Sequence, residues 1–95
     1  IQFVPLNMRA WHAGESSFKG IKDCNNYSIG IELEGTDCDV YSNEQYESLI
    51  KISRLIIKNY PETNKDSIVG HSDISPGRKT DPGNKFEWRR YLDAL

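Results

Sequence analysis

Apolar residues recur at helical spacing over residues 43–59, where they fall every three or four positions and so share one face of a helix. Ser42 and Gln45 have the spacing of a capping box at the start of this stretch, and Pro61 follows its end. We therefore predict a helix over residues 43–59. Its apolar stripe consists of Tyr46, Leu49, Ile50, Ile56, Ile57 and Tyr60, widened by Ile52 and Leu55.

The same spacing returns near the end of the chain. Asn84 is placed to start a helix, in which Glu87 would occupy the third position. The apolar residues that follow stand at positions i, i+3, i+4 and i+7, and they are Trp88, Tyr91, Leu92 and Leu95. This pattern predicts a last helix that begins at Asn84 and presents one apolar face.

Alternation of apolar and polar residues, which is typical of a strand, marks residues 27–35. The branched residues Ile29, Ile31 and Leu33 would face a core. The opposite face would be polar, with a bare spot at Gly30 where another group could approach closely. We predict a strand over this stretch.

Two shorter stretches also have strand character. Residues 1–4 alternate weakly, and residues 67–70 form a short apolar run that leads into His71. Residues 5–27 follow no period, and a loop of that length is usually functional or hides an element. Strands followed by helices predict an α/β fold for a single domain over residues 1–95, a mixed β-sheet covered by α-helices. Because sheets usually have about 4–6 strands, this sheet is expected to be incomplete.

Composition and charge narrow the classes of function. The net charge is -2 and the isoelectric point is about 5.6, so no basic surface is expected to attract nucleic acid or an anionic membrane. No apolar run approaches the roughly 20 residues of a membrane-spanning helix. Cys24 and Cys38 form no CxxC motif and favour reduced thiols, hence a reducing compartment, over a single disulfide.

Candidate chemistry is concentrated in residues 70–83, a stretch of loop-like composition. His71 and Asp81 are residue types that bind zinc, and a loop that folds back could bring them together. On spacing alone the stronger interpretation is an ordinary loop histidine and a turn aspartate. A catalytic zinc ion normally has three protein ligands, and the other histidine, His12, lies far away along the chain.

Three further positions could carry chemistry. Glu32 lies on the polar face of the predicted strand, where it is either solvated or held in a cleft as a general base. Lys79 either belongs to a solvated basic turn or lies close enough to a metal to stabilise an oxyanion. Trp11, beside His12, could stack on a sugar or peptide, or pack beneath its own loop.

Three segments together resemble a known family: RAWHAG at residues 9–14, NYSIGIELEGTD at residues 26–37, and GHSDISPGRKTDPG at residues 70–83. In order and spacing they closely resemble the AmpD-type N-acetyl-anhydromuramyl-L-alanine amidases, bacterial enzymes with the type-2 amidase fold. The resemblance covers nearly the whole chain. It implies a cytoplasmic enzyme of cell-wall recycling that cleaves the amide between the lactyl group of anhydro-N-acetylmuramic acid and the L-alanine of the stem peptide.

The resemblance also implies a Zn²⁺ cofactor and roles for individual residues. His71 and Asp81 match two of the three zinc ligands in the family. Glu32 matches the general base, and Lys79 matches the residue that stabilises the oxyanion. The residues that match the border of the substrate groove are Trp11, His12, Ala13 and Arg78. The implied reaction is metal-assisted hydrolysis of an amide in a muropeptide.

One zinc ligand of the family has no match in this sequence. That histidine lies upstream of the position that matches Ile1, and His12 matches a different position. We therefore expect residues 1–95 to be the C-terminal part of an amidase domain that lacks activity by itself. We further expect association of the chain with itself or with a chain that carries the missing segment. The alternative function is a non-catalytic muropeptide-binding remnant of the same fold.

Overall fold

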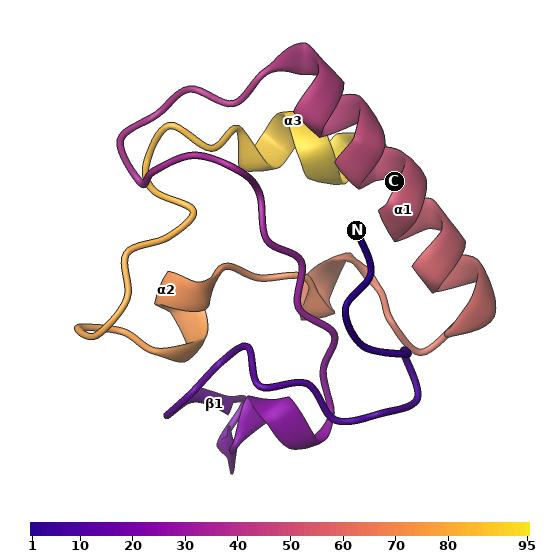
Figure 1. The fold of residues 1–95 in the computed structure, drawn as a ribbon, viewed down its shortest axis with the longest axis vertical. Coiled ribbons are helices and arrows are strands. Elements are labelled where there is room, and N and C mark those ends of the chain that lie inside the picture. The colour runs from indigo at the N-terminus through magenta and orange to yellow at the C-terminus, as the bar shows by residue number, and fades with distance from the viewer.

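The longest element of the computed structural model, which describes residues 1–95, is helix α1 (Asn43–Asn59). It flanks one side of the molecule (Figure 1). Its first turn is closed by the predicted capping box, because the Ser42 hydroxyl accepts the amide of Gln45 at 3.1 Å and the Gln45 side chain accepts the amide of Ser42 at 2.9 Å. The predicted helix is therefore confirmed at both of its ends.

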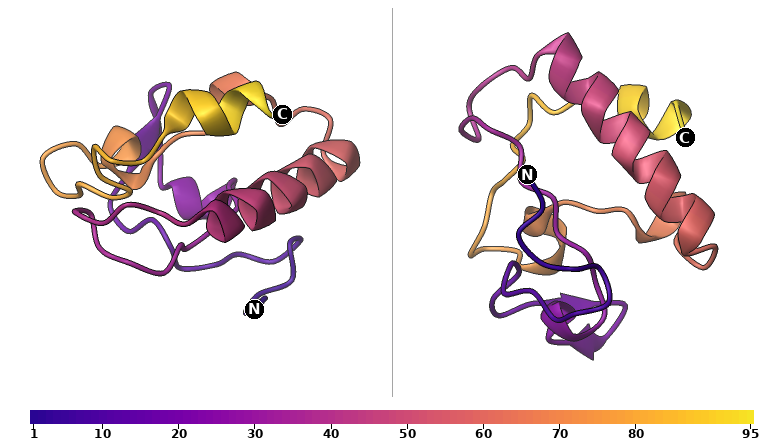
Figure 2. Two further views of the ribbon diagram at one scale, coloured as in Figure 1. Left: turned by 90° about the horizontal axis from the view of Figure 1, so that it is seen from above. Right: turned by 45° about the vertical axis from the view of Figure 1, so that its right-hand side comes forward.

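Helix α3 (Trp88–Asp93) lies beside α1 in all three ribbon views (Figures 1 and 2). Its N-cap is Glu87, three residues later than Asn84, the predicted N-cap, and this is a correction. Phe86 is buried in the core, and the amide of Glu87 donates to the Tyr46 hydroxyl at 2.8 Å. These contacts with α1 hold the chain before Trp88 in a turn, so tertiary packing overrides the local helix signal.

The hydrophobic core joins these two helices and is mostly aromatic. Its buried members are Tyr41, Tyr46, Leu49, Phe86 and Tyr91. The Phe86 ring is stacked on Tyr46 at 5.4 Å between centroids and meets Tyr41 edge-on at 5.6 Å, and both are favourable aromatic geometries. The predicted apolar face of the last helix is confirmed, since Tyr91 belongs to this core and Trp88, Leu92 and Leu95 pack against it.

The core-facing side of α1 differs from the predicted stripe at its edge. Ile52 and Leu55 are exposed by 47% and 61%, while Ser53 is buried between them in sequence. The Ser53 hydroxyl lies 2.5 Å from that of Tyr91, so each of these buried polar groups has a hydrogen-bond partner. The prediction that Ile52 and Leu55 belong to the buried stripe was therefore wrong. The contact with α3 at this point is made by the hydroxyl groups of Ser53 and Tyr91.

A small hairpin occupies part of the stretch predicted to be irregular. Strands β1 (Ser17–Phe18) and β2 (Ile21–Lys22) pair antiparallel. Their two-residue turn, Lys19 and Gly20, has φ angles of 50° and 81°, the left-handed pair that fits tight hairpins. A 3₁₀ turn, η1 (Cys24–Asn26), follows directly. Strands of two residues are too short to show a period, so the sequence pattern could not predict them.

Residues 27–35 cross the middle of the molecule without forming a strand (Figure 1). None of the residues 28–35 takes part in a backbone–backbone hydrogen bond. Residues 1–4 and 67–70 are likewise not strands, and the 3₁₀ turn η2 (Lys65–Ser67) precedes the latter. All three strand predictions were wrong for this chain, because a strand is defined by pairing and no partner lies beside these segments.

Two chain-wide features complete the description. No helix of the structure has the length and apolar character needed to cross a membrane. Cys24 is buried and Cys38 is exposed, and the two thiols are not joined.

The unpaired segment 28–35 leads to a prediction about association. Ile31 is exposed by 43% on a backbone whose amides and carbonyls have no backbone partners. Such an edge is a template for pairing with another chain, so we expect the average mass in light scattering to rise with protein concentration.

The substitution Ile31→Lys should reduce this association, because a charge on an open strand edge opposes pairing. Val40→Lys is the matched control, since Val40 is also exposed but lies outside the segment. A stable monomer at high concentration would contradict the prediction.

Candidate functional site

Residues 70–83 fold back on themselves around a short helix, α2 (His71–Ile74), seen at the lower left of Figure 1. The Asp73 carboxylate accepts the amide of Gly70 at 2.8 Å and so closes the first turn. The amide of Ser72 donates to the carbonyl of Asp81 at 3.0 Å. This last bond returns the end of the loop to its beginning, which places Asp81 beside His71.

The imidazole of His71 lies between two acceptors. Its Nδ1 is 3.2 Å from Asp81 Oδ2, and its Nε2 is 2.8 Å from the carbonyl oxygen of Ala13. Both of these oxygens only accept hydrogen bonds, so a protonated ring satisfies both of them, whereas the neutral ring satisfies one and turns a lone pair toward the other. When the single proton is on Nε2, the lone pair of Nδ1 faces the Asp81 carboxylate, and a cation between the two would relieve that repulsion.

Arg78 ties the same carbonyl to the loop. Its Nη2 lies 2.6 Å from the Ala13 oxygen and 3.0 Å from that of Glu15, and it is also 3.1 Å from the Ser75 hydroxyl. The Ser75 hydroxyl itself donates to Glu15 at 2.7 Å. Residues 13–15 are thus docked against the turn that follows α2, although they lie about 60 positions earlier in the chain.

His12 sits next to this cluster with its own ring orientation fixed. Ser28 donates its hydroxyl proton to the carbonyl of Cys24 at 2.5 Å, so its oxygen accepts from His12 Nε2 at 3.1 Å. Burial lowers the pKa of His12 from its ordinary value, and the charge of His71 lowers it further. The negative charge of Glu32 acts in the opposite direction and raises the pKa of His12. The Glu32 carboxylate therefore lies close enough to the His12 ring for an electrostatic interaction.

Gly30 lets His12 lie where it does. A Cβ atom at position 30 would stand 2.5 Å from Cγ of the His12 ring, far inside contact distance. The predicted close approach of another group at Gly30 is therefore confirmed, and that group is the imidazole of His12.

Asn25 is a buried residue of this region that the sequence analysis did not single out. Its side-chain oxygen accepts the amides of His12 and Ala13 at 3.0 and 2.8 Å, which fixes the backbone that carries both residues. The only signal in the sequence is the Asn25-Asn26 pair, which is equally typical of a turn.

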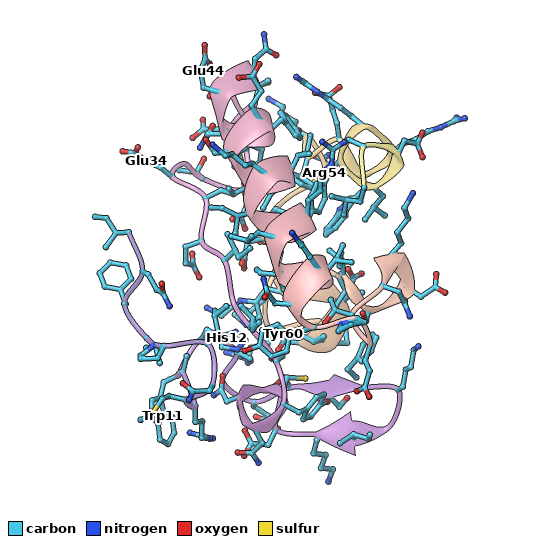
Figure 3. All side chains as sticks on the ribbon, turned by 90° about the vertical axis from the view of Figure 1, so that its right-hand side faces the viewer. Trp11, His12, Glu34, Glu44, Arg54 and Tyr60 are labelled. Carbon is cyan, nitrogen blue, oxygen red and sulfur yellow. The ribbon has the colours of Figure 1, made fainter.

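The remaining predicted residues are distributed around the cluster. Glu32 and Lys79 are exposed, and neither side chain makes a hydrogen bond or ion pair within the chain. Trp11 is exposed by 85% and projects outward, whereas His12 points toward the body of the molecule (Figure 3). The structure therefore brings His71, Asp81, Ala13, Arg78 and His12 together and leaves Trp11 at the rim.

Trp11 borders a shallow hollow of about 370 Å³. Arg9, which the sequence analysis named only within its motif, lies with its guanidinium carbon 3.8 Å from the centre of the Trp11 ring. The same guanidinium pairs with Asp23 at 3.1 Å. Stacking and pairing hold the indole in place while one of its faces stays open to solvent.

A metal-binding group of three or more His, Cys, Asp or Glu side chains does not occur within residues 1–95. The described chain thus offers the His71–Asp81 pair, with His12 and Glu32 nearby but outside ligand geometry.

The class of protein follows from a family comparison. The family model described as N-acetylmuramoyl-L-alanine amidase, Amidase_2, matches residues 1–84, so this chain belongs to the Amidase_2 family of N-acetylmuramoyl-L-alanine amidases. This confirms the resemblance noted in the sequence.

Individual relatives narrow the comparison. The chain is 52% identical over 94 residues to the 1,6-anhydro-N-acetylmuramyl-L-alanine amidase AmpD of Haemophilus influenzae, and 50% identical over 91 residues to that of Escherichia coli K12. These alignments include 99% and 96% of this chain but 51% and 49% of the relatives. The chain thus spans about half the length of the curated relatives it matches.

Solved structures confirm the predicted fold class. A crystal structure of a selenomethionine AmpD derivative is similar over 100% of this chain and 52% of its own, with a TM-score of 0.96 and 46% identity. AmpDh3 of Pseudomonas aeruginosa, solved in complex with an anhydromuramic pentapeptide, gives a TM-score of 0.89 and 35% identity, over 99% of this chain and 40% of its own.

Gly83 provides a test of how tightly the loop is held. A Cβ atom there would lie 1.9 Å from the carbonyl oxygen of Asp37, whereas a Cβ at Gly77 would meet nothing within 4 Å. Both glycines have positive φ angles, 88° and 79°, so both substitutions to alanine cost about 1–2 kcal/mol in backbone strain.

We expect Gly83→Ala to lower the free energy of unfolding in urea well beyond Gly77→Ala, because the Asp37 backbone must move as well. Equal losses for the two variants would show that the loop can shift freely.

The lowered pKa of His12 gives a dependence on pH. Since the folded pKa lies below the unfolded value of about 6.5, the neutral ring contributes stability that is fully present above pH 6.5. This contribution is lost as the pH falls through the folded pKa. We expect a titration of the His12 ring by NMR to show a midpoint below 6.5, and a midpoint at or above 6.5 would contradict the burial argument.

Proposed function

We propose that this chain carries part of the active site of a zinc-dependent amidase, which hydrolyses the lactyl–L-alanine amide of anhydro-N-acetylmuramyl peptides in cell-wall recycling. The observation that carries the proposal is the convergence of His71 and Asp81 from opposite ends of one loop. The AmpD names of the relatives supply the amide that is cleaved. A cytoplasmic location is part of the same proposal.

The His71–Asp81 pair fits zinc in distance and in chemistry. Two ligands of a tetrahedral ion with bonds of about 2.0–2.1 Å stand about 3.3–3.4 Å apart. The separation between His71 Nδ1 and Asp81 Oδ2 is 3.2 Å. With its proton on Nε2, toward the Ala13 carbonyl, the neutral ring would offer at Nδ1 the lone pair that a ligand needs. Zinc would supply Lewis-acid polarisation of the amide carbonyl and make a water molecule easier to deprotonate.

Glu32 and Lys79 would carry the proton and the charge of the reaction. The exposed Glu32 carboxylate would accept a proton from the attacking water and return it to the nitrogen of the departing L-alanine. The Lys79 ammonium, which has no partner within the chain, would offset the negative charge that forms on the former carbonyl oxygen. Glu32 and Lys79 are thus available for proton transfer and charge stabilisation, whereas His71 and Asp81 would be engaged as metal ligands.

The muropeptide would lie along the surface between this site and Trp11. The open face of the indole suits stacking on a sugar ring, and the hollow beside it offers room for a peptide. Ala13 and Arg78 form hydrogen bonds to other residues of the chain, and they would border this surface. The pentapeptide bound to AmpDh3 supports a ligand of this class.

A chimera tests the proposal. In it, this chain replaces the matched 94 residues of Haemophilus influenzae AmpD, so that the unmatched half of that relative is present. We expect hydrolysis of anhydro-muropeptide that is lost on chelation and restored by zinc. Glu32→Gln should lower kcat by about 10²–10⁴-fold, and Lys79→Met by about 10²–10³-fold.

Glu34→Gln and Lys65→Met are the matched controls and should retain activity, because both residues are exposed and lie outside the cluster. The 95-residue chain alone should hydrolyse little substrate and bind zinc weakly. Saturable muropeptide binding without hydrolysis in a folded, zinc-loaded chimera would favour the non-catalytic alternative instead.

A further inference from the structure

We propose that Arg78 is a positioning residue that acts through the backbone carbonyl of Ala13 to fix the ring of His71. The carbonyl oxygen receives two donors at once, Arg78 Nη2 at 2.6 Å and His71 Nε2 at 2.8 Å. The two donor nitrogens are 3.5 Å apart, so they approach the oxygen side by side. A fixed guanidinium charge thus anchors the acceptor that orients the imidazole.

This arrangement changes what Arg78 does for the site. The sequence resemblance assigns it to the substrate groove, but its Nη2 group is directed to Ala13, Glu15 and Ser75. Bonds from a charged donor are stronger than bonds from a neutral one. Arg78 is therefore suited to hold a loop in place.

The loop around Ala13 is held from two sides. Gly14 has a φ angle of 63°, and a Cβ there would lie 2.9 Å from Arg78 Nη2, so the loop folds directly over the guanidinium. On the other side, Asn25 binds the amide of Ala13. The peptide groups on both sides of Ala13 are thereby held by one buried amide and one arginine.

Fixing the Ala13 carbonyl favours the form of His71 that has its proton on Nε2, because this oxygen accepts that proton. In that form the lone pair of Nδ1 faces Asp81 Oδ2. Outer groups of this kind orient a ligand, and their removal typically lowers metal affinity by about 10–100-fold. The metal part of this inference rests on the proposed function, whereas the position of the proton does not.

The first test uses the metal-free chain at about pH 8, above the ordinary pKa of histidine. Nitrogen NMR of the wild-type chain should show the His71 proton on Nε2. In Arg78→Met the exchange of this proton with water should be at least about tenfold faster, and Arg78→Lys should restore part of the protection. Arg89→Met is the control, since the Arg89 side chain is 95% exposed and its only ion pair is with Asp93.

Resonances of the core residues Tyr46 and Phe86 report whether each variant is folded, which separates a local effect from general unfolding. A wild-type His71 whose Nε2 lacks the proton would overturn the proposal even if no variant folds. Unchanged exchange in a folded Arg78→Met would overturn it equally.

The second test measures cobalt and zinc affinity in the chimera with Haemophilus influenzae AmpD. Arg78→Met should weaken metal binding by about 10–100-fold and Arg78→Lys by less, with no change in Arg89→Met. If the chimera binds no metal while the proton result holds, the proposed function fails and the positioning role of Arg78 stands. Unchanged metal affinity in Arg78→Met would refute the metal part of the inference.

Discussion

A single backbone oxygen connects the two halves of this chain's chemistry. The carbonyl of Ala13 accepts from His71, 58 positions later, and from Arg78, 65 positions later. Together with the bonds from Ser75 and Arg78 to the carbonyl of Glu15, these bonds fix the loop that carries Trp11 and His12 relative to the loop that carries Asp81. Breaking a hydrogen bond from an ionised donor destabilises the fold most when the acceptor stays buried. When His71 is protonated, the Ala13 oxygen accepts from two ionised donors, His71 and Arg78.

The opposite side of the same loop is held by the aromatic core. The Tyr41 hydroxyl donates to the carbonyl of Pro82 at 2.8 Å, and Tyr46 accepts the amide of Glu87. Both rings pack on Phe86, so the apolar contacts between α1 and α3 also position the polar tips of these tyrosines. His71 and Asp81 therefore lie between a backbone carbonyl on one side and a packed aromatic cluster on the other.

Features that depend on neighbouring residues could be predicted from the sequence, and those that depend on distant partners could not. Helix 43–59 carries its own cap and stripe, so its ends were predicted correctly. The stretch 27–35 has a clear strand pattern, yet it remains unpaired here because pairing requires another backbone.

The candidate site also has features that could be predicted from the sequence and features that could not. The spacing of His71 and Asp81 allowed a loop that folds back to join them but favoured an ordinary loop, and it was the resemblance to the amidases that predicted the pair. The role of Ala13 could not be predicted. Every residue has a backbone carbonyl, and the sequence does not indicate which carbonyl will accept a hydrogen bond from His71. The contacts of Arg78 with that carbonyl were hidden for the same reason.

The closeness of Gly30 and His12 has a consequence for how sequences of this kind can diverge. The imidazole fills the space that any side chain at position 30 would need, since a Cβ there would reach within 2.5 Å of the ring. Neither residue can therefore change freely while the other stays as it is. A lineage that gains a side chain at position 30 is expected to carry a smaller residue at position 12, so the two positions should vary as a coupled pair.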